Sequence, residues 1–212
     1  MSGKKIVIID YGMGNIQSIV NALIFLGYKA SLSRESEILN QADCYILPGV
    51  GAFGLAMENL KKYNLIDILE ENVITKKKPI LGICLGMQLL AKSSTEISFH
   101  KGLGWIDATI EELRVTEDLR VPHVGWNAVE IRQELPLFKG IASDSHFYFD
   151  HSFQMVCHDK SLLGSVAFYG EGITASIQKD NIFATQFHPE KSQIAGLKLL
   201  RNFLNFMENS DA

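Results

Sequence analysis

The chain has few cysteines, and none of them are closely spaced. Its 212 residues contain three, Cys44, Cys84 and Cys157, with no Cys-x-x-Cys motif. A disulfide framework uses an even set of cysteines, and a structural zinc site uses closely spaced thiolate or imidazole ligands. The sequence therefore predicts neither kind of site. We expect no metal, no cofactor and a reduced, cytoplasmic environment.

Long apolar runs and a strong excess of one charge are also missing. No stretch of about 18 uncharged apolar residues occurs, so no membrane-spanning helix is predicted. Lys4 and Lys5 are followed by too short an apolar run for a signal peptide. The net charge of −4 argues against nucleic acid or an anionic membrane surface as a partner.

Length and composition fit one well-buried domain. A chain of 212 residues with 47% hydrophobic residues can bury a sizeable core but is short for two domains. We expect one domain over residues 1–208. Residues 209–212 are expected to be a frayed tail.

The first eighty or so residues alternate between apolar strand-like runs and helical patterns. The predicted strands are residues 6–10, 28–33, 44–47 and 79–83. The predicted helices are residues 15–27, 35–40 and 53–75, the last broken near Asn64. Strands that alternate with helices predict a parallel sheet with helices on both faces.

The second half is richer in strand-like segments. These are residues 105–110, 127–131, 146–153, 164–169, 173–178 and 182–187, and a helix is predicted over residues 194–207. The turn at 178–181 reads as a hairpin, which pairs its strands antiparallel. We therefore predict an α/β fold: a single domain with a mixed, largely parallel central sheet flanked by helices, and additional antiparallel strands in the second half.

Cys84 stands in a distinctive context. The segment Gly82-Ile83-Cys84-Leu85-Gly86 follows an apolar strand and precedes a helical pattern. A strand that turns directly into a helix strains the backbone at the turn, and neighbouring glycines let the two segments approach. The pattern predicts a nucleophile elbow with an exposed, reactive thiol at a helix N-terminus. Cys44 and Cys157 lack this context, so we expect them in the core or on a strand face.

A thiol nucleophile needs a base, and His188 is the histidine best placed to serve as one. It ends an apolar strand and precedes Pro189, which cannot donate to a sheet ladder. In extended chain, residues two apart point to the same side, so Glu190 can reach the imidazole and orient it. Cys84, His188 and Glu190 thus form a candidate nucleophile, base and orienting group. Taken alone, the His-Pro-Glu segment would also fit a surface turn.

A glycine-rich turn follows the strand predicted at 44–47. Its sequence is Pro48-Gly49-Val50-Gly51, and the two glycines allow a peptide unit to aim its N–H at a developing oxyanion. We predict an oxyanion hole formed by the backbone N–H groups near Val50, Gly51 and Leu85. A plain strand-to-helix turn would explain the same glycines.

Together these motifs carry a family resemblance over nearly the whole chain. Gly-Ile-Cys-Leu-Gly-Met-Gln at 82–88, Pro-Gly-Val-Gly at 48–51 and Phe-His-Pro-Glu at 187–190 resemble the triad-type (class I) glutamine amidotransferases. Further segments at 10–15, 122–127, 147–153 and 187–192 resemble the glutaminase subunits of imidazole glycerol phosphate synthases.

The resemblance implies a glutaminase that acts within a larger synthase. Cys84 would attack glutamine, which Gln88 and the backbone of Ser152 and Phe153 would bind. The ammonia would pass to a (β/α)₈ cyclase subunit, in a heterodimer, that makes imidazole glycerol phosphate and aminoimidazole carboxamide ribotide in histidine biosynthesis. The residues that would face this partner are Asn15, Trp126 and Lys191.

Two positions depart from the family pattern. Asp150 stands where the family usually has an apolar residue, and Phe153 stands where it has tyrosine. Both lie in the segment that, by resemblance, holds glutamine. We expect glutamine affinity or partner fit to differ from those of a typical member.

Three rival functions stay open. A related glutaminase could supply a paralogous cyclase-like synthase that amidates a nucleotide sugar for surface polysaccharide, which the two departures favour. A cysteine hydrolase or protease would share the elbow but needs an open substrate groove. A non-catalytic binding module would typically have lost a member of the triad. For the other histidines of the second half, His123, His146 and His151, we expect hydrogen-bonded or surface positions.

Overall fold

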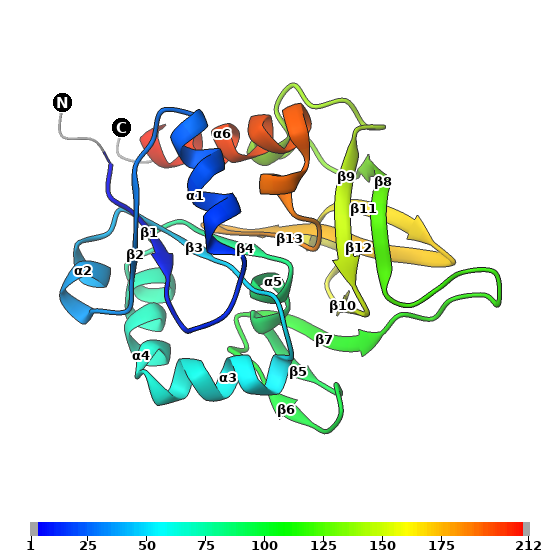
Figure 1. The fold of residues 1–212 in the computed structure, drawn as a ribbon, viewed down its shortest axis with the longest axis horizontal. Helices are drawn as coiled ribbons and strands as arrows, with labels where there is room; N and C mark the ends of the chain where they lie inside the picture. Colours follow the sequence, from blue (N-terminus) through cyan, green and yellow to red (C-terminus); the bar gives the residue numbers. More distant parts are fainter. Residues whose placement is uncertain (1–3, 210–212) are drawn as a thin grey trace.

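A computed structural model describes residues 4–209, and Figure 1 shows the arrangement of its elements. Within these residues a nine-stranded sheet has the order β2-β1-β3-β4-β13-β12-β11-β8-β9. Its strands are β1 (Ile6–Ile9), β2 (Ala30–Ser33), β3 (Cys44–Leu47), β4 (Ile80–Ile83), β8 (His123–Ile131), β9 (His146–His151), β11 (Leu163–Tyr169), β12 (Glu171–Lys179) and β13 (Ile182–Thr185). We call this the large sheet.

The large sheet has a parallel half and an antiparallel half that meet at β13. The neighbours from β2 to β13 pair parallel. The neighbours from β13 to β9 pair antiparallel. The predicted α/β fold, with a mixed sheet and antiparallel strands in the second half, is confirmed. The sequence predicts a largely parallel sheet, but four of its eight strand pairings are antiparallel because the second half of the chain joins the same sheet.

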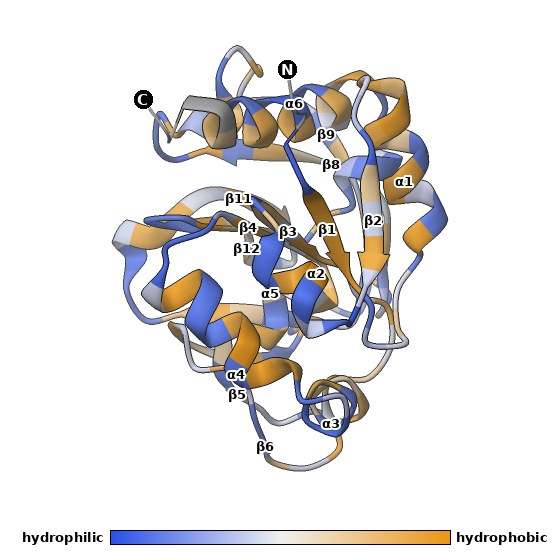
Figure 2. Ribbon diagram, turned by 90° about the vertical axis from the view of Figure 1, so that its left-hand side faces the viewer, coloured by the Kyte–Doolittle hydropathy of each residue, from blue (hydrophilic) through white to orange (hydrophobic). Residues whose placement is uncertain are grey.

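Helices cover both faces of the parallel half (Figure 1). On one face lie α1 (Ile16–Phe25) and α6 (Gln193–Asn209), and on the other lie α2 (Ser36–Gln41), α3 (Phe53–Lys62), α4 (Leu65–Leu69) and α5 (Leu85–Leu89). Side chains along a strand alternate between its faces. Accordingly, Ile6 and Ile8 join the core under α1 and α6, while Val7 and Ile9 join the core under α3 to α5. Figure 2 shows β1 as hydrophobic along its length, between helices that carry both hydrophobic and hydrophilic residues.

Two local predictions in this half are confirmed by the backbone. The helical region at 53–75 breaks at Asn64, whose φ of 54° is left-handed, and then continues as α4 and a π-helical turn, η1 (Glu70–Thr75). The first helix is followed by Gly27, which has a φ of 89°. A glycine takes such an angle without the steric cost that a Cβ brings, which ends the helix cleanly.

The sequence missed a second sheet. Its order is β10-β7-β5-β6, with β5 (Ala91–Ser94), β6 (His100–Lys101), β7 (Ile106–Glu112) and β10 (Phe153–Cys157). The single strand predicted at 146–153 is therefore wrong, because the chain leaves the large sheet after β9 and enters the second sheet as β10. β5 and β6 were not predicted because they are short, and β5 is largely polar.

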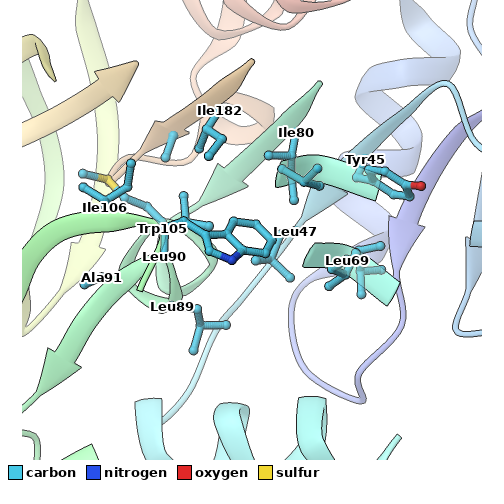
Figure 3. Close-up of a cluster of buried hydrophobic side chains, with 14 of the residues drawn as sticks. Tyr45, Leu47, Leu69, Ile80, Leu89, Leu90, Ala91, Trp105, Ile106 and Ile182 are labelled. Atoms are coloured by element: carbon cyan, nitrogen blue, oxygen red, sulfur yellow. The ribbon is translucent and has the colours of Figure 1, made fainter. Parts of the chain in front are cut away.

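The second sheet packs on the same side of the large sheet as α3 to α5. Figure 3 shows Trp105 in the middle of this core, with Leu47 from the large sheet, Leu90 from the end of α5 and Ile106 from the second sheet. The junction of the two sheets is therefore a single apolar core. The chain can pass from one sheet to the other at Ser152 without exposing that core.

The remaining elements are short turns, and the end of the chain differs slightly from the prediction. The 3₁₀ turns are η2 (Pro136–Phe138), η3 (Lys160–Leu162) and η4 (Pro189–Lys191). The helix predicted at 194–207 extends over Gln193–Asn209, so only residues 210–212 of the predicted tail remain, and these lie outside the described residues. Over residues 4–209, no helix is both long and apolar enough to cross a membrane.

Candidate active site

Cys84 occupies a strained turn between β4 and α5. Its φ of 54° and ψ of −109° are unusual for a residue with a side chain, and its N–H donates to the Thr185 carbonyl at 2.7 Å. At Gly86 an added Cβ would lie 1.9 Å from the carbonyl oxygen of Leu47, so only glycine lets α5 approach the end of β3 this closely. The backbone geometry is that of a nucleophile elbow.

The thiol is less exposed than the sequence predicts. Cys84 is 6% exposed and lines the cavity described below. The following helix, α5, has five residues, so few peptide dipoles add up at its N-terminus. We therefore look to the neighbouring side chains for the groups that activate the sulfur.

His188 and Glu190 form a buried pair beside this sulfur. The His188 Nδ1 atom lies 2.8 Å from Glu190 Oε1, and their side chains are 3% and 1% exposed. The sequence predicts this contact from an extended chain in which residues two apart point to the same side, and that argument is only half right. His188 is extended, but Glu190 returns to it through the 3₁₀ turn η4. The His188 backbone is anchored in turn, since its N–H donates to the Tyr148 carbonyl and its carbonyl accepts from Ser192 Oγ.

The electrostatics of the pair favour a protonated imidazole. Burial alone lowers the pKa of His188, but hydrogen bonds to Cys84 and Glu190 outweigh burial and raise this pKa to about 10. Since Nδ1 is bonded to Glu190, Nε2 is the nitrogen that faces the sulfur. Within the described part of the chain, Glu190 Oε2 is buried without a hydrogen-bond partner, so His188 is the main group that compensates the carboxylate charge.

A cavity of about 250 Å³ opens onto the sulfur. Its lining includes Cys84 and every residue predicted for the oxyanion hole or for substrate binding, namely Val50, Gly51, Leu85, Gln88, Ser152 and Phe153. Segments that lie far apart in the sequence, the turn after β3, the start of α5 and the passage from β9 to β10, are thus brought to one place.

Sequence reasoning missed several residues of this cavity. They are Glu96, Pro122 and His151, whereas Asp150, which the sequence placed in the segment expected to hold glutamine, also lines the cavity. Glu96 lies in the loop between β5 and β6, two strands that the sequence did not reveal, and its carboxylate accepts from the Phe53 N–H at 2.6 Å. For His151, its position within the recognised segment at 147–153 was the available signal.

Gln88 ties the substrate-binding segment to the nucleophile. Its Nε2 donates to the Phe153 carbonyl at 3.0 Å and to Gln186 Oε1 at 3.1 Å. Gln186 Nε2 in turn donates to the Cys84 sulfur at 3.6 Å. The backbone carbonyl of Asp150 lies 3.8 Å from the sulfur and accepts from the thiol.

His123 and His151 form a second, neutral histidine pair. Both are buried, and His123 Nδ1 lies 3.0 Å from His151 Nε2. Burial lowers the pKa of each to about 4. His151 Nδ1 lies 2.8 Å from the Phe153 carbonyl, which only an N–H can satisfy. His151 therefore donates from Nδ1 and accepts at Nε2, and His123 donates to it. Of the three histidines set aside above, only His146 is exposed.

The residues expected to face a partner lie on an exposed surface beside the triad. Trp126 is 46% exposed and packs against Tyr148, with ring centroids 6.0 Å apart. Lys191 Nζ lies 5.4 Å from the centroid of the same Tyr148 ring. Asn15 is exposed directly before α1, which contacts the turn η4 that carries Lys191.

The chemistry of this site depends on side chains and backbone groups. In the part of the chain that the structure describes, no three His, Cys, Asp or Glu side chains are grouped to hold a metal ion. A thiol, an imidazole oriented by a carboxylate, and backbone N–H groups are together sufficient for acyl transfer through a covalent thioester.

Comparison with known proteins gives matches along nearly the whole chain. The family model described as glutamine amidotransferase class-I matches residues 7–206. Imidazole glycerol phosphate synthase subunit HisH 2 of Vibrio vulnificus is 51% identical over 205 residues, which cover 96% of this chain and 95% of that protein. Subunit HisH 1 of Campylobacter jejuni is 47% identical over 199 residues, covering 94% of this chain and 98% of that protein.

Solved structures share the fold at much lower identity. A GMP synthase subunit of Thermoplasma acidophilum aligns with a TM-score of 0.74 at 18% identity and covers 100% of this chain and 97% of its own. A glutamine amidotransferase of Thermotoga maritima aligns with a TM-score of 0.68 at 18% identity. The alignment covers 99% of this chain and 100% of that chain. These likenesses establish the α/β fold.

Proposed function

Because this chain belongs to the class-I glutamine amidotransferases, and among them to the HisH subunits of imidazole glycerol phosphate synthase, we propose a specific reaction for it. It hydrolyses glutamine to glutamate and ammonia, and the ammonia is used by a (β/α)₈ cyclase subunit in histidine biosynthesis. The observation that carries the proposal is a cavity lined by Cys84 and the residues of the predicted oxyanion hole, with His188 hydrogen-bonded to Cys84 behind it.

The reaction proceeds through a thioester. The Cys84 proton resides on His188 Nε2 before attack, and the sulfur, as a thiolate, attacks the side-chain amide carbon of glutamine. Backbone N–H groups near Val50, Gly51 and Leu85 hold the oxyanion. As the tetrahedral intermediate collapses, the C–N bond breaks, and His188 gives the proton to the departing ammonia. Water, deprotonated by the same imidazole, then hydrolyses the thioester to glutamate.

The cavity suits a free amino acid better than a peptide. Its volume of about 250 Å³ lies just below the roughly 300–1,000 Å³ typical of sites for drug-sized ligands. The Glu96 carboxylate in its wall is complementary to the α-ammonium group that free glutamine has and a peptide-bound residue lacks. Both features count against the cysteine protease considered above.

The proposal includes a heterodimer in the cytoplasm. The subunits HisH named in the comparisons belong to a synthase with more than one subunit. The exposed surface with Trp126, Tyr148 and Lys191 lies directly behind the His188 backbone, so we assign it to the cyclase.

A second candidate function keeps the glutaminase and changes the acceptor. Several relatives have numbered names, such as HisH 2 in Vibrio vulnificus and HisH 2 in Pseudomonas aeruginosa. Such numbering distinguishes one HisH subunit from another. The departures at Asp150 and Phe153 are the observation that favours a paralogue serving a synthase that amidates a nucleotide sugar.

Purification of the chain together with the cyclase-like subunit encoded beside it tests both candidates. We expect formation of imidazole glycerol phosphate from glutamine. With Cys84→Ala we expect this activity to be lost while synthesis from ammonium salts continues, because the thiol serves only ammonia release. Glutamine consumption with a nucleotide-sugar acceptor alone would favour the second candidate. Full glutaminase activity in Cys84→Ala would contradict both.

A further inference from the structure

Gln186 is a buried amide beside the nucleophile that the mechanism above does not use. It follows β13, and its side chain is completely buried. A buried amide is unfavourable unless its N–H and C=O groups find partners, so its partners show what holds it in place. Both side-chain partners of Gln186 belong to the active site: Gln88 on one side and the Cys84 sulfur on the other.

The orientation of the Gln186 amide follows from Gln88. Gln88 Nε2 has two acceptors, the Phe153 carbonyl at 3.0 Å and Gln186 Oε1 at 3.1 Å. Turning the Gln186 amide around would set two NH₂ groups against each other and point a carbonyl oxygen at the sulfur. The network therefore fixes the Gln186 NH₂ group toward Sγ, at 3.6 Å.

Besides His188, the sulfur has an acceptor and a donor within reach. A thiol can donate to the Asp150 carbonyl, which lies 3.8 Å away. A thiolate has no proton to donate and is instead stabilised by an N–H donor, which Gln186 supplies. The two contacts come from different elements, β9 and the end of β13, and only the contact with Gln186 can persist once the sulfur has lost its proton.

We propose that Gln186 is a positioning residue that stabilises Cys84 as a thiolate and links it to Gln88. When the thiol proton moves to His188 Nε2, the sulfur lone pair accepts the Gln186 N–H, and no other bond is made or broken. In the thioester the sulfur no longer carries this charge, so the contact acts before attack and not after it. The link to glutamine through Gln88 rests on the proposed function, whereas the contact with the sulfur does not.

Other ionisable groups also face Cys84, and variants at position 186 leave these groups in the protein. His188, backed by Glu190, hydrogen-bonds to the sulfur. Tyr11 is close enough that the charge of Cys84, together with burial, raises its pKa. Glu96, Asp150 and His151 line the same cavity. A variant at position 186 changes none of them directly.

The test is the rate of Cys84 alkylation by iodoacetamide as a function of pH, followed on the Cys84 peptide by mass spectrometry. Gln186→Met keeps the side-chain length and removes the N–H donor. We expect alkylation roughly tenfold slower at pH 7, a profile displaced to higher pH and an unchanged plateau at high pH. Gln186→Glu keeps an acceptor for Gln88 but also lacks the N–H donor. Its alkylation profile should be displaced to higher pH at least as far as that of Gln186→Met.

Ser176→Ala is the matched control. Ser176 is buried on the neighbouring strand β12 and loses a hydrogen bond to Ser165 Oγ, but it makes no contact with the sulfur. Its alkylation profile should coincide with that of the unchanged chain. Gln88→Met should give a smaller displacement in the same direction as Gln186→Met, because it removes the partner that orients the Gln186 amide.

Profiles of Gln186→Met and Gln186→Glu that coincide with the unchanged chain, in proteins that melt cooperatively, would overturn the proposal. Alkylation needs neither glutamine nor a partner subunit, so this result is separate from the fate of the proposed function. The variants could also show a displaced alkylation profile while the chain never hydrolyses glutamine. That result would support the contact between Gln186 and the sulfur. It would overturn both the proposed glutaminase activity and the link from Gln186 to glutamine through Gln88.

Discussion

The two halves of the large sheet hold buried histidines in opposite protonation states. At the end of the parallel half, after β13, His188 has a pKa raised to about 10. On β8 and β9 of the antiparallel half, the pKa of His123 and of His151 is lowered to about 4. All three side chains are nearly inaccessible to solvent. Burial therefore does not decide the charge. His188 faces a carboxylate and a thiol, whereas the other two face each other and a carbonyl.

The neutral state of the second pair matters for the substrate-binding segment. The Phe153 carbonyl accepts from His151 Nδ1 at 2.8 Å and from Gln88 at 3.0 Å. Protonation of His151 at Nε2 would place two N–H groups against each other across 3.0 Å, and protonation of His123 at Nε2 would set an N–H against the amide nitrogen of Asn127 at 3.4 Å. The antiparallel half thus holds the cavity wall only while its histidines are uncharged, and the parallel half supplies the charged imidazole.

The largest effect is expected where the charged histidine is removed. His188→Asn should reduce turnover of glutamine by about 10²–10⁴-fold, because general acid and base help is lost. Glu190→Gln should cost less, since the amide can still hold the imidazole in place. Steady-state ammonia release by both variants checks the order. A larger loss in Glu190→Gln than in His188→Asn would reverse the roles assigned to them.

A smaller effect is expected on the free energy of unfolding at acid pH, and it should come from the neutral pair His123 and His151. Because the folded pKa of His151 lies near 4, below its ordinary 6.5, the unfolded chain binds the proton more readily between these values. Stability is therefore complete above pH 6.5 and falls as pH drops toward 4, by roughly 3 kcal/mol for one such histidine. Urea unfolding at pH 7 and pH 4.5 measures this fall.

Two variants localise that acid sensitivity. His151→Gln carries no titrating group, so its stability should change less between pH 7 and pH 4.5 than that of the unchanged chain. His146→Gln lies on the same strand but is exposed, so its pH dependence should match that of the unchanged chain. An equal fall in the free energy of unfolding for the unchanged chain, His151→Gln and His146→Gln would show that the buried histidine pair does not cause the acid sensitivity.

The parts of the site that lie within short segments were predictable. The elbow at Cys84, the contact of His188 with Glu190 and the turn at Val50 each depend on a few consecutive residues, whose glycines, proline and periodicity report local backbone geometry. The alternation of strands and helices as far as Ile83 has the same local origin, and the structure confirms it.

The parts that depend on distant pairing were not predictable. Gln186 finds its partners 98 and 102 residues away, and in the sequence it is one polar residue in an apolar run. Glu96 enters the cavity from a loop between β5 and β6, which become strands only by pairing within the second sheet. His123 and His151 meet only because β8 pairs with β9 in one particular register.

The central claim is that Cys84 alone is the nucleophile that attacks glutamine. Its most direct measurement is peptide mass spectrometry of the chain after treatment with a glutamine analogue that carries an electrophilic carbon in place of the side-chain amide. We predict covalent labelling of Cys84, loss of ammonia release in the same proportion, and no labelling of the buried Cys44 and Cys157. Loss of activity with Cys84 unlabelled, or equal labelling of all three cysteines, would contradict it.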